Sequence, residues 1–230
     1  MNKTTHSCVN CGSRTCMTRT GEYPEFCPTT ALTEEEINEV VRLYTEDPVN
    51  SKVAVASAEI EGEFYGRYTR VEETIEFAKR IGAKKIGIAT CVGLLEESRM
   101  LARILQLNGF EVYSVNCKLG SVNKTDLGVE EQFTCVTGVV ACNPILQAKT
   151  LNKQKTDLNI VMGLCCGHDS MFYKYAEGLT TTLVVKDRVL AHNPIGALYQ
   201  ARAYYKRLLQ SDAGKEIAPE DNRISAQNKN

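Results

Sequence analysis

Apolar residues in the first part of the chain recur at the spacing of helices. Thr33 with Glu36 forms a capping-box pattern, and the apolar positions that follow have a helical period. Thr69 with Glu72 repeats this pattern before another apolar stripe of the same period. A further helix is expected between them, over residues 53–64. This part of the chain therefore predicts three successive helices.

From residue 85 onwards the pattern changes to short apolar runs separated by amphipathic stretches. Strands that alternate with helices predict an α/β fold, a mostly parallel sheet with helices on both faces. Residues 118–132 are polar and predict an excursion or a lid. The runs predict strands over residues 85–90, 110–116, 136–141, 158–164 and 181–186. The amphipathic stretches predict helices over residues 96–108, over 142–152, after residue 169, and in a long C-terminal segment that opens at Asn193-Pro194.

Length and composition fit one large domain, or one domain with a small appendage. Of the 230 residues, 43% are hydrophobic and 24% are charged, which is enough for a substantial core. We expect a cysteine-rich metal-binding segment over residues 1–30, the α/β domain over 31–210 and a polar tail over 211–230. The net charge of −1 gives no reason to expect nucleic acid or an anionic membrane as a partner.

Nothing in the amino-acid pattern predicts export or a membrane span. The longest apolar runs are far too short to cross a bilayer, and the first residues lack an apolar signal region. We therefore expect a cytoplasmic protein. Its ten cysteines are then expected to be reduced, which favours metal ligation over disulfides.

Four cysteines lie within the first 27 residues, in the pattern C-x2-C-x4-C-x10-C-P: Cys8, Cys11, Cys16 and Cys27. Thiolates this close in a polar loop repel one another unless a cation, a cluster or disulfides neutralise them. Both Zn²⁺ and an iron–sulfur cluster accept four sulfurs from such a loop. Because the gaps match no common signature, the sequence predicts a metal site and leaves the metal open.

Most of the other cysteines lie where predicted strands end. Cys91 and Cys117 each follow a strand. The adjacent pair Cys165-Cys166 follows another strand, and Cys142 precedes a helix. In open α/β sheets ligands bind at the carboxyl ends of strands, near the point where the strand order reverses. These cysteines therefore predict a second sulfur-rich site, to which one of the adjacent pair contributes.

A short internal repeat supports this grouping. Residues 141–145 read Ala-Cys-Asn-Pro-Ile, and residues 191–195 read Ala-His-Asn-Pro-Ile. In each, Asn suits the N-cap and Pro the first helical position. Cys142 and His192 therefore both precede a predicted helix N-terminus, where the dipole lowers the pKa of a thiol. Cys135 lies outside the pattern, and we expect it to be buried as a small apolar side chain.

The candidate metal ligands of the second site are Cys91, Cys117, Cys142 and Cys165. Their alternative role is that of small buried side chains. The catalytic candidates are His168, His192 and Cys166, of which the two histidines suit acid–base chemistry. The alternative for His168 is a plain helix start.

Two cations follow the last predicted strand. Lys186 and Arg188 are candidates for binding an anionic substrate or the sulfides of a cluster. Their alternative role is that of a solvated turn.

Several motifs together resemble a known family. They are Cys8-x2-Cys11-Gly with Cys16, Tyr-Pro-x-x-Cys at 23–27, Cys91-x-Gly93, Cys117-Lys118, Cys142-Asn-Pro144, Gly-Leu-Cys-Cys-Gly-His-Asp at 163–169 and Val-Lys-Asp-Arg-Val-Leu-x-His-Asn-Pro at 185–194. With these motifs the chain resembles the bacterial and archaeal family called DUF1847, described as metal-binding proteins. The resemblance covers most of the chain except the tail. It implies metal binding through cysteine and supplies no reaction.

Three hypotheses follow. The leading one is an iron–sulfur (4Fe-4S) protein with one centre in the N-terminal loop and another at the strand ends, where an open cluster would act on a small anionic or sulfur-containing molecule. The alternative is a zinc protein with a structural four-cysteine site and a thiol-lined ligand pocket. The third is an enzyme whose nucleophile is Cys165 or Cys166, paired with His168. No P-loop, dinucleotide-binding or zincin motif is present.

Overall fold

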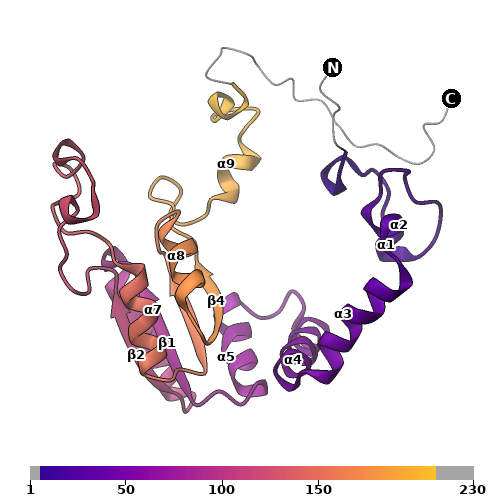
Figure 1. Cartoon of the computed structure of the whole chain (residues 1–230), viewed down its shortest axis with the longest axis horizontal. Coiled ribbons are helices and arrows are strands. Elements are labelled where there is room, and N and C mark those ends of the chain that lie inside the picture. Colours follow the sequence, from indigo (N-terminus) through magenta and orange to yellow (C-terminus); the bar gives the residue numbers. More distant parts are fainter. Residues whose placement is uncertain (1–5, 211–230) are drawn as a thin grey trace. The chain divides into compact units, whose positions relative to one another are not determined.

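The structure is a computed structural model, and it describes residues 6–210. These residues form two compact units (Figure 1). The larger unit spans residues 55–199, and the described part of the smaller one consists of residues 6–54 and 200–210. Within residues 6–210 no helix is both long enough and apolar enough to cross a membrane.

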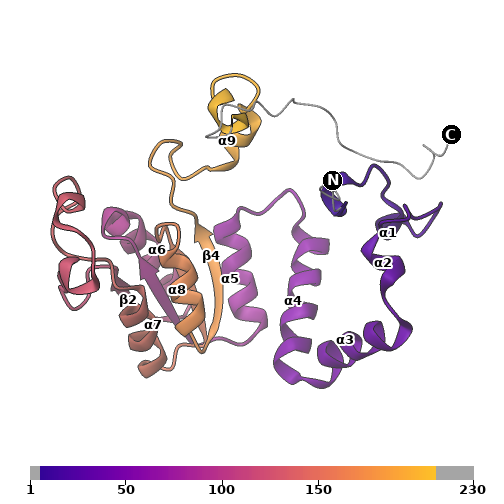
Figure 2. The ribbon, with the colours of Figure 1, turned by 45° about the horizontal axis from the view of Figure 1, so that its top comes forward.

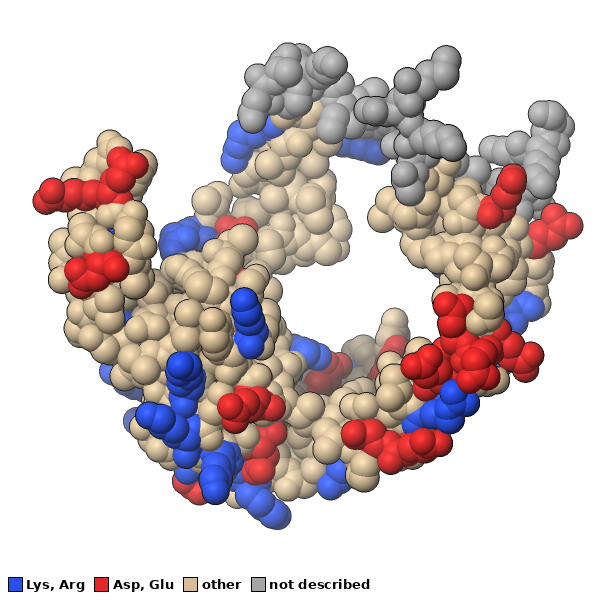
Figure 3. All heavy atoms as spheres, viewed as in Figure 1, with Lys and Arg blue, Asp and Glu red and all other residues tan. Residues whose placement is uncertain are grey.

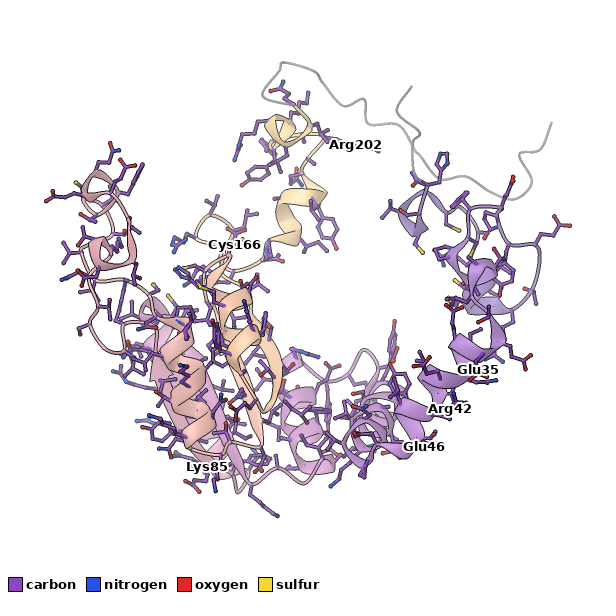
Figure 4. The ribbon with its side chains drawn as sticks, in the orientation of Figure 1. Glu35, Arg42, Glu46, Lys85, Cys166 and Arg202 are labelled. Atoms are coloured by element: carbon purple, nitrogen blue, oxygen red, sulfur yellow. The ribbon has the colours of Figure 1, made fainter. Side chains whose placement is uncertain are left out.

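The smaller unit contains α3 (Glu34–Glu46), which begins where the sequence predicts. Thr33 Oγ1 accepts a hydrogen bond from Glu36 N, and the Glu36 carboxylate accepts one from Thr33 N at 2.8 Å, so the capping box forms. Every residue of α3 is exposed. Acidic side chains gather along this helix in Figure 3, and Figure 4 shows Arg42 near Glu35, its partner in an ion pair of 2.8 Å. The other elements are η1 (Cys8–Asn10), α1 (Thr15–Thr18), α2 (Pro28–Ala31) and η5 (Lys206–Leu209).

Four parallel strands form the sheet of the larger unit, in the order β2-β1-β3-β4. They are β1 (Lys85–Thr90), β2 (Glu111–Asn116), β3 (Leu158–Met162) and β4 (Leu179–Val184). Ile86 of β1 lies opposite Val112 of β2 and Leu158 of β3. The chain moves from β1 outward to β2, and later from β3 outward to β4, so the strand order reverses between β1 and β3. The predicted α/β fold with a parallel sheet is confirmed.

Helices connect these strands and precede them. They are α4 (Pro48–Phe64), α5 (Arg70–Arg80), α6 (Leu95–Leu107), α7 (Pro144–Lys153), α8 (His168–Tyr175) and α9 (Ile195–Tyr199), with the short turns η2 (Val92–Leu94), η3 (Thr125–Leu127) and η4 (Glu131–Phe133). The boundary between the two units falls within α4. The α5 helix begins at the predicted Thr69–Glu72 capping box.

The two faces of the sheet carry separate apolar cores, because successive strand side chains point to opposite faces. Ile86, Ile88 and Ile160 pack with residues of α5 and α6. Ala89 and Val161 pack with residues of α7 and α8. Figure 1 shows α7 and α8 side by side, and Figure 2 shows α5 beside the edge strand β4. The helices therefore cover both faces, as predicted.

The α7 helix approaches the sheet closely at Gly87 of β1. A Cβ atom at this position would overlap Asn159 Oδ1 and would lie 2.9 Å from Leu151 Cδ1. Leu151 belongs to α7, and both it and Asn159 are fully buried. Glycine at this position therefore allows α7 to pack on the strands.

Two predicted elements are wrong. Residues 136–141 form no strand: Val136 is 97% exposed, Gly138 has a φ of 76°, and the segment makes one antiparallel bridge, between Val140 and Asn123. The predicted long C-terminal helix is limited to α9 and a later 3₁₀ turn. Leu198 and other apolar residues of this segment are exposed, and a short helix without tertiary packing is marginal.

The predicted burial of Cys135 is also wrong. The sequence favours a buried thiol at this position, whereas the structure leaves it exposed in the excursion between β2 and α7. The excursion contributes no strand to the sheet, so its apolar side chains have no core to enter.

Candidate metal and ligand site

A cavity of about 750 Å³ opens at the carboxyl ends of the strands. Its walls come from the turns after all four strands and from the excursion between β2 and α7. Parallel α/β sheets bind ligands at this edge, where the strand order reverses, and here the reversal lies between β1 and β3. In Figure 4, Cys166 marks this end of the unit, and Lys85, the first residue of β1, lies at the opposite end. The topology therefore places the cavity at the expected ligand-binding edge.

Three cysteines meet at this edge of the sheet. Cys91 follows β1 and Cys117 follows β2, and both are buried. The Sγ atom of Cys117 accepts a hydrogen bond from Val92 N at 3.3 Å. Cys142 comes from the end of the excursion, and its Sγ atom lies 3.7 Å from that of Cys117. The structure thus brings together thiols that are far apart in sequence.

The start of α7 fixes Cys142 in this position. Asn143 is the N-cap, as predicted, and its side chain accepts a hydrogen bond from Leu146 N at 3.0 Å. Asn143 N also donates to Cys117 O at 2.7 Å. This backbone link holds the residue after Cys142 against the end of β2.

A buried side chain of α7 joins the ends of β1 and β2. Gln147 is fully buried, and its Nε2 atom donates to Thr90 O at 3.1 Å and to Val115 O at 2.9 Å. Thr90 immediately precedes Cys91, and Val115 lies two residues before Cys117. Gln147 therefore ties together the two strand ends that carry the buried cysteines.

The three thiols differ in acidity because they contact one another. A hydrogen bond with the Cys117 thiol lowers the pKa of Cys91, helped by Gly93 N and by the charge of Lys186. Hydrogen bonds with Cys117 and His168 lower the pKa of Cys142. The pKa of Cys117 itself is raised, because this thiol lies between the other two and is buried. Cys91 and Cys142 are therefore the more acidic of the three thiols, and Cys117 is the least acidic.

His168 completes this wall of the cavity. It opens α8, and its pKa is raised above the usual value because the Cys142 thiolate lies beside the imidazole, against the opposing effect of burial. Its Nδ1 atom is buried and has no hydrogen-bond partner among residues 6–210. A buried polar atom without a partner is costly unless a ligand or an ion satisfies it.

The two adjacent cysteines after β3 have different environments. Cys165 lines the cavity, and its Sγ atom accepts a hydrogen bond from Arg188 Nη2 at 2.9 Å. Cys166 is exposed and is not part of the cavity wall. Their side chains therefore point differently, as the sequence predicts for adjacent residues in a turn.

The turn after β4 forms a further part of the wall. Lys186, Arg188 and His192 all line the cavity. Asp187 Oδ1 accepts hydrogen bonds from Val189 N and Leu190 N, at 2.9 and 2.8 Å. His192 Nδ1 accepts one from Asp187 N at 3.1 Å, so Nε2 carries the proton of the neutral imidazole. These bonds order the turn and fix the orientation of His192.

The N-terminal cysteines lie in the smaller unit. Cys8 and Cys16 are exposed, and Cys11 and Cys27 are partly buried. A hydrogen bond with the Thr29 side chain lowers the pKa of Cys27. Among the hydrogen bonds of residues 6–210, none joins two of these four sulfurs. The predicted N-terminal metal site stays a prediction.

Several cavity residues escaped the sequence analysis as site candidates, among them Lys118, Lys124, Leu127, Val129 and Phe133. Lys118 directly follows a strand-end cysteine, and this position could have predicted that it belongs to the site. Lys124 and Phe133 belong to the excursion, whose path over the sheet edge no periodic pattern encodes. Gln147 was missed as well, although its spacing from Pro144 and Leu151 places a polar side chain on the buried face of a helix.

The groups at this edge do not yet surround a common point. Among the residues that the structure describes, no three Cys, His, Asp or Glu side chains form a group that could hold a metal ion as they stand. The Cys117 and Cys142 sulfurs lie 3.7 Å apart, so a metal ion here would have to draw the other groups of the cavity wall toward this pair.

Comparisons with known proteins give a family and no activity. The family described as "protein of unknown function (DUF1847)" matches residues 27–183, a range that contains the strand-end cysteines and His168. An uncharacterized protein of Methanocaldococcus jannaschii is 50% identical over 161 residues, which cover 70% of this chain and 82% of that protein. No solved structure matches the chain.

Proposed function

The chain belongs to the DUF1847 family, and from the geometry of its sheet edge we propose that it binds a single tetrahedral metal ion at the carboxyl ends of β1 and β2. The proposed ligands are the thiolates of Cys91, Cys117 and Cys142 and the imidazole of His168. Three thiolates and one imidazole form a common ligand set of Zn²⁺, which we propose as the metal.

The separation of the Cys117 and Cys142 sulfurs, 3.7 Å, carries this proposal. In a tetrahedron with metal–sulfur bonds of about 2.3 Å, two sulfurs stand about 3.8 Å apart. In a [4Fe–4S] cluster each cysteine binds a different iron, so the sulfurs stand farther apart than two ligands of one ion. The observed spacing therefore fits two ligands of one ion better than two ligands of a cluster.

The environment of the other two ligands supports the same assignment. The buried Nδ1 atom of His168 has no partner in the described part of the chain, and a metal ion would satisfy it. The lowered pKa of Cys91 indicates a thiolate ready for ligation. The pKa of the Cys117 thiol is raised in the metal-free protein, so metal binding would release a proton from it and would strengthen as the pH rises.

An iron–sulfur cluster is the second candidate, because the cavity leaves room beside the thiols for a larger centre. Cys165 lines the same cavity and would provide a further thiolate. Arg188, which donates to Cys165, would then balance the negative charge of cluster sulfides. In this arrangement His168 is left for acid–base chemistry.

The experiment is metal and acid-labile sulfide analysis of the full chain purified without oxygen. We expect Cys142→Ser to lose about one equivalent of zinc per chain, because one of four ligands is removed. Cys135→Ser is the matched control, since this thiol is exposed and lies outside the cavity. Circular dichroism of each variant confirms that it is folded.

Two results would decide against the single zinc ion. Iron together with sulfide, lost on Cys142→Ser, would replace it with the cluster. A metal content that is equal in wild type, Cys142→Ser and Cys135→Ser would remove the strand-edge centre altogether. The metal lost in a Cys11→Ser variant measures any metal that the N-terminal loop holds, apart from metal at the strand edge.

A further inference from the structure

The cavity beside the proposed metal centre carries an excess of positive charge. Four cationic side chains line it, against the carboxylate of Asp187 and the acidic thiols of the proposed metal site. Two of the cations come from the excursion and two from the turn after β4, so they lie on different walls: Lys118, Lys124, Lys186 and Arg188.

In the described part of the chain, none of these four cations forms an ion pair with a carboxylate. The salt bridges among residues 6–210 involve none of the four, whereas Arg80, outside the cavity, pairs with three glutamates. Lys118 Nζ donates to Val140 O at 2.7 Å, Lys124 Nζ donates to Thr137 Oγ1, and Arg188 donates to Cys165. These hydrogen bonds position the Lys118, Lys124 and Arg188 side chains but bring no carboxylate to neutralise their positive charges.

The same cavity has an apolar wall on the excursion. Leu127, Val129 and Phe133 line it, and Leu127 and Phe133 remain 60% and 65% exposed. The base of the excursion is fixed by hydrogen bonds of Lys124 N to Val139 O and of Ala141 N to Val122 O. An inorganic anion would engage the cations and leave this apolar wall in water.

We infer that the cavity binds a small organic anion, with a carboxylate or phosphate group at the cations and an apolar part against Leu127, Val129 and Phe133. A volume of about 750 Å³ suits a ligand of that size. This inference rests on the proposed function, because a bound Zn²⁺ ion offsets two of the three thiolate charges, so that the four cations outnumber the negative charges that remain and can bind an external anion.

The test uses a fluorescent organic anion, 1-anilinonaphthalene-8-sulfonate, titrated into the metal-loaded full chain. Decanoate, which has an anionic head and an apolar tail, should displace the dye. Acetate, which lacks the tail, and decyltrimethylammonium, whose head is cationic, should each compete at least tenfold more weakly. Arg188→Gln and Phe133→Ser should each weaken decanoate binding about tenfold, as expected for one charge-assisted hydrogen bond or one aromatic contact.

Matched controls are Arg103→Gln and Leu107→Ser, which change exposed residues of α6 outside the cavity. Equal competition by acetate or decyltrimethylammonium, or equal losses in the control and cavity variants, would overturn the inference. The metal content of every sample is measured in parallel. Wild-type protein that holds metal but binds no decanoate refutes this inference alone, and wild-type protein without metal refutes the proposed function.

Discussion

At the scale of single residues, the site depends on polar groups that sequence patterns rarely identify. Gln147 binds no candidate ligand side chain, yet its amide nitrogen bonds the backbone on both strands that end in a buried cysteine. Partners that orient metal ligands in this indirect way commonly affect metal affinity. Gln147 is therefore a positioning residue of the proposed centre.

Gln147→Leu should weaken metal binding about tenfold and lower the free energy of unfolding by about 2 kcal/mol, because two buried carbonyls lose a donor. Metal competition with a chelator measures the first effect, and urea unfolding measures the second. Gln106→Leu, at an exposed position of α6, is the control and should change neither quantity appreciably. Unchanged metal affinity in Gln147→Leu would show that this residue only packs the core.

The thiols of the metal-free protein should react over different pH ranges. Cys142 has a lowered pKa, so it stays a thiolate as the pH falls below about 8.5, the value of a free cysteine. Iodoacetamide should therefore label Cys142 at pH values where a free cysteine peptide no longer reacts. Mass spectrometry of the Cys142 peptide measures the rate, and a profile equal to that of the free peptide would contradict the interaction with Cys117 and His168.

At the scale of elements, the sequence predicted the helix starts and strand positions that depend on local residue patterns. The Thr33 and Thr69 capping boxes begin α3 and α5, and residues 85–90 form β1 with the predicted bounds. The strand-end cysteines fall at one edge because parallel strands share their carboxyl ends. The excursion before α7 could not be predicted, since its form depends on bonds such as that of Lys118 Nζ to Val140 O rather than on periodicity.

The contact between α7 and the sheet gives a prediction at this scale. Gly87→Ala should lower the free energy of unfolding by about 2 kcal/mol, because the new methyl group overlaps Asn159 and crowds Leu151. Gly62→Ala is the matched change inside α4, where a Cβ would meet nothing within 4 Å, and it should stabilise by up to about 1 kcal/mol. Thermal unfolding of both variants tests this, and similar effects of the two would contradict the close packing.

At the scale of the whole molecule, two cysteine-rich regions lie in two separate units. The larger unit carries the strand-edge thiols, the cavity and its cations. The N-terminal cysteines belong to the smaller unit and stay a predicted second site. Among residues 6–210, no hydrogen bond joins two of these N-terminal thiols. The proposed centre and the proposed anion site are thus both properties of the α/β unit, and they can be tested with the N-terminal thiols removed.

The most direct test of the strand-edge centre is X-ray absorption spectroscopy of the full chain carrying Cys8→Ser and Cys11→Ser, so that the metal at the sheet edge dominates. The account predicts zinc with three sulfur neighbours at about 2.3 Å and one nitrogen at about 2.0–2.1 Å. Iron with iron–iron scattering would replace the single ion with a cluster. A metal without sulfur neighbours, or no metal at all, would contradict the assignment of Cys91, Cys117 and Cys142 as ligands.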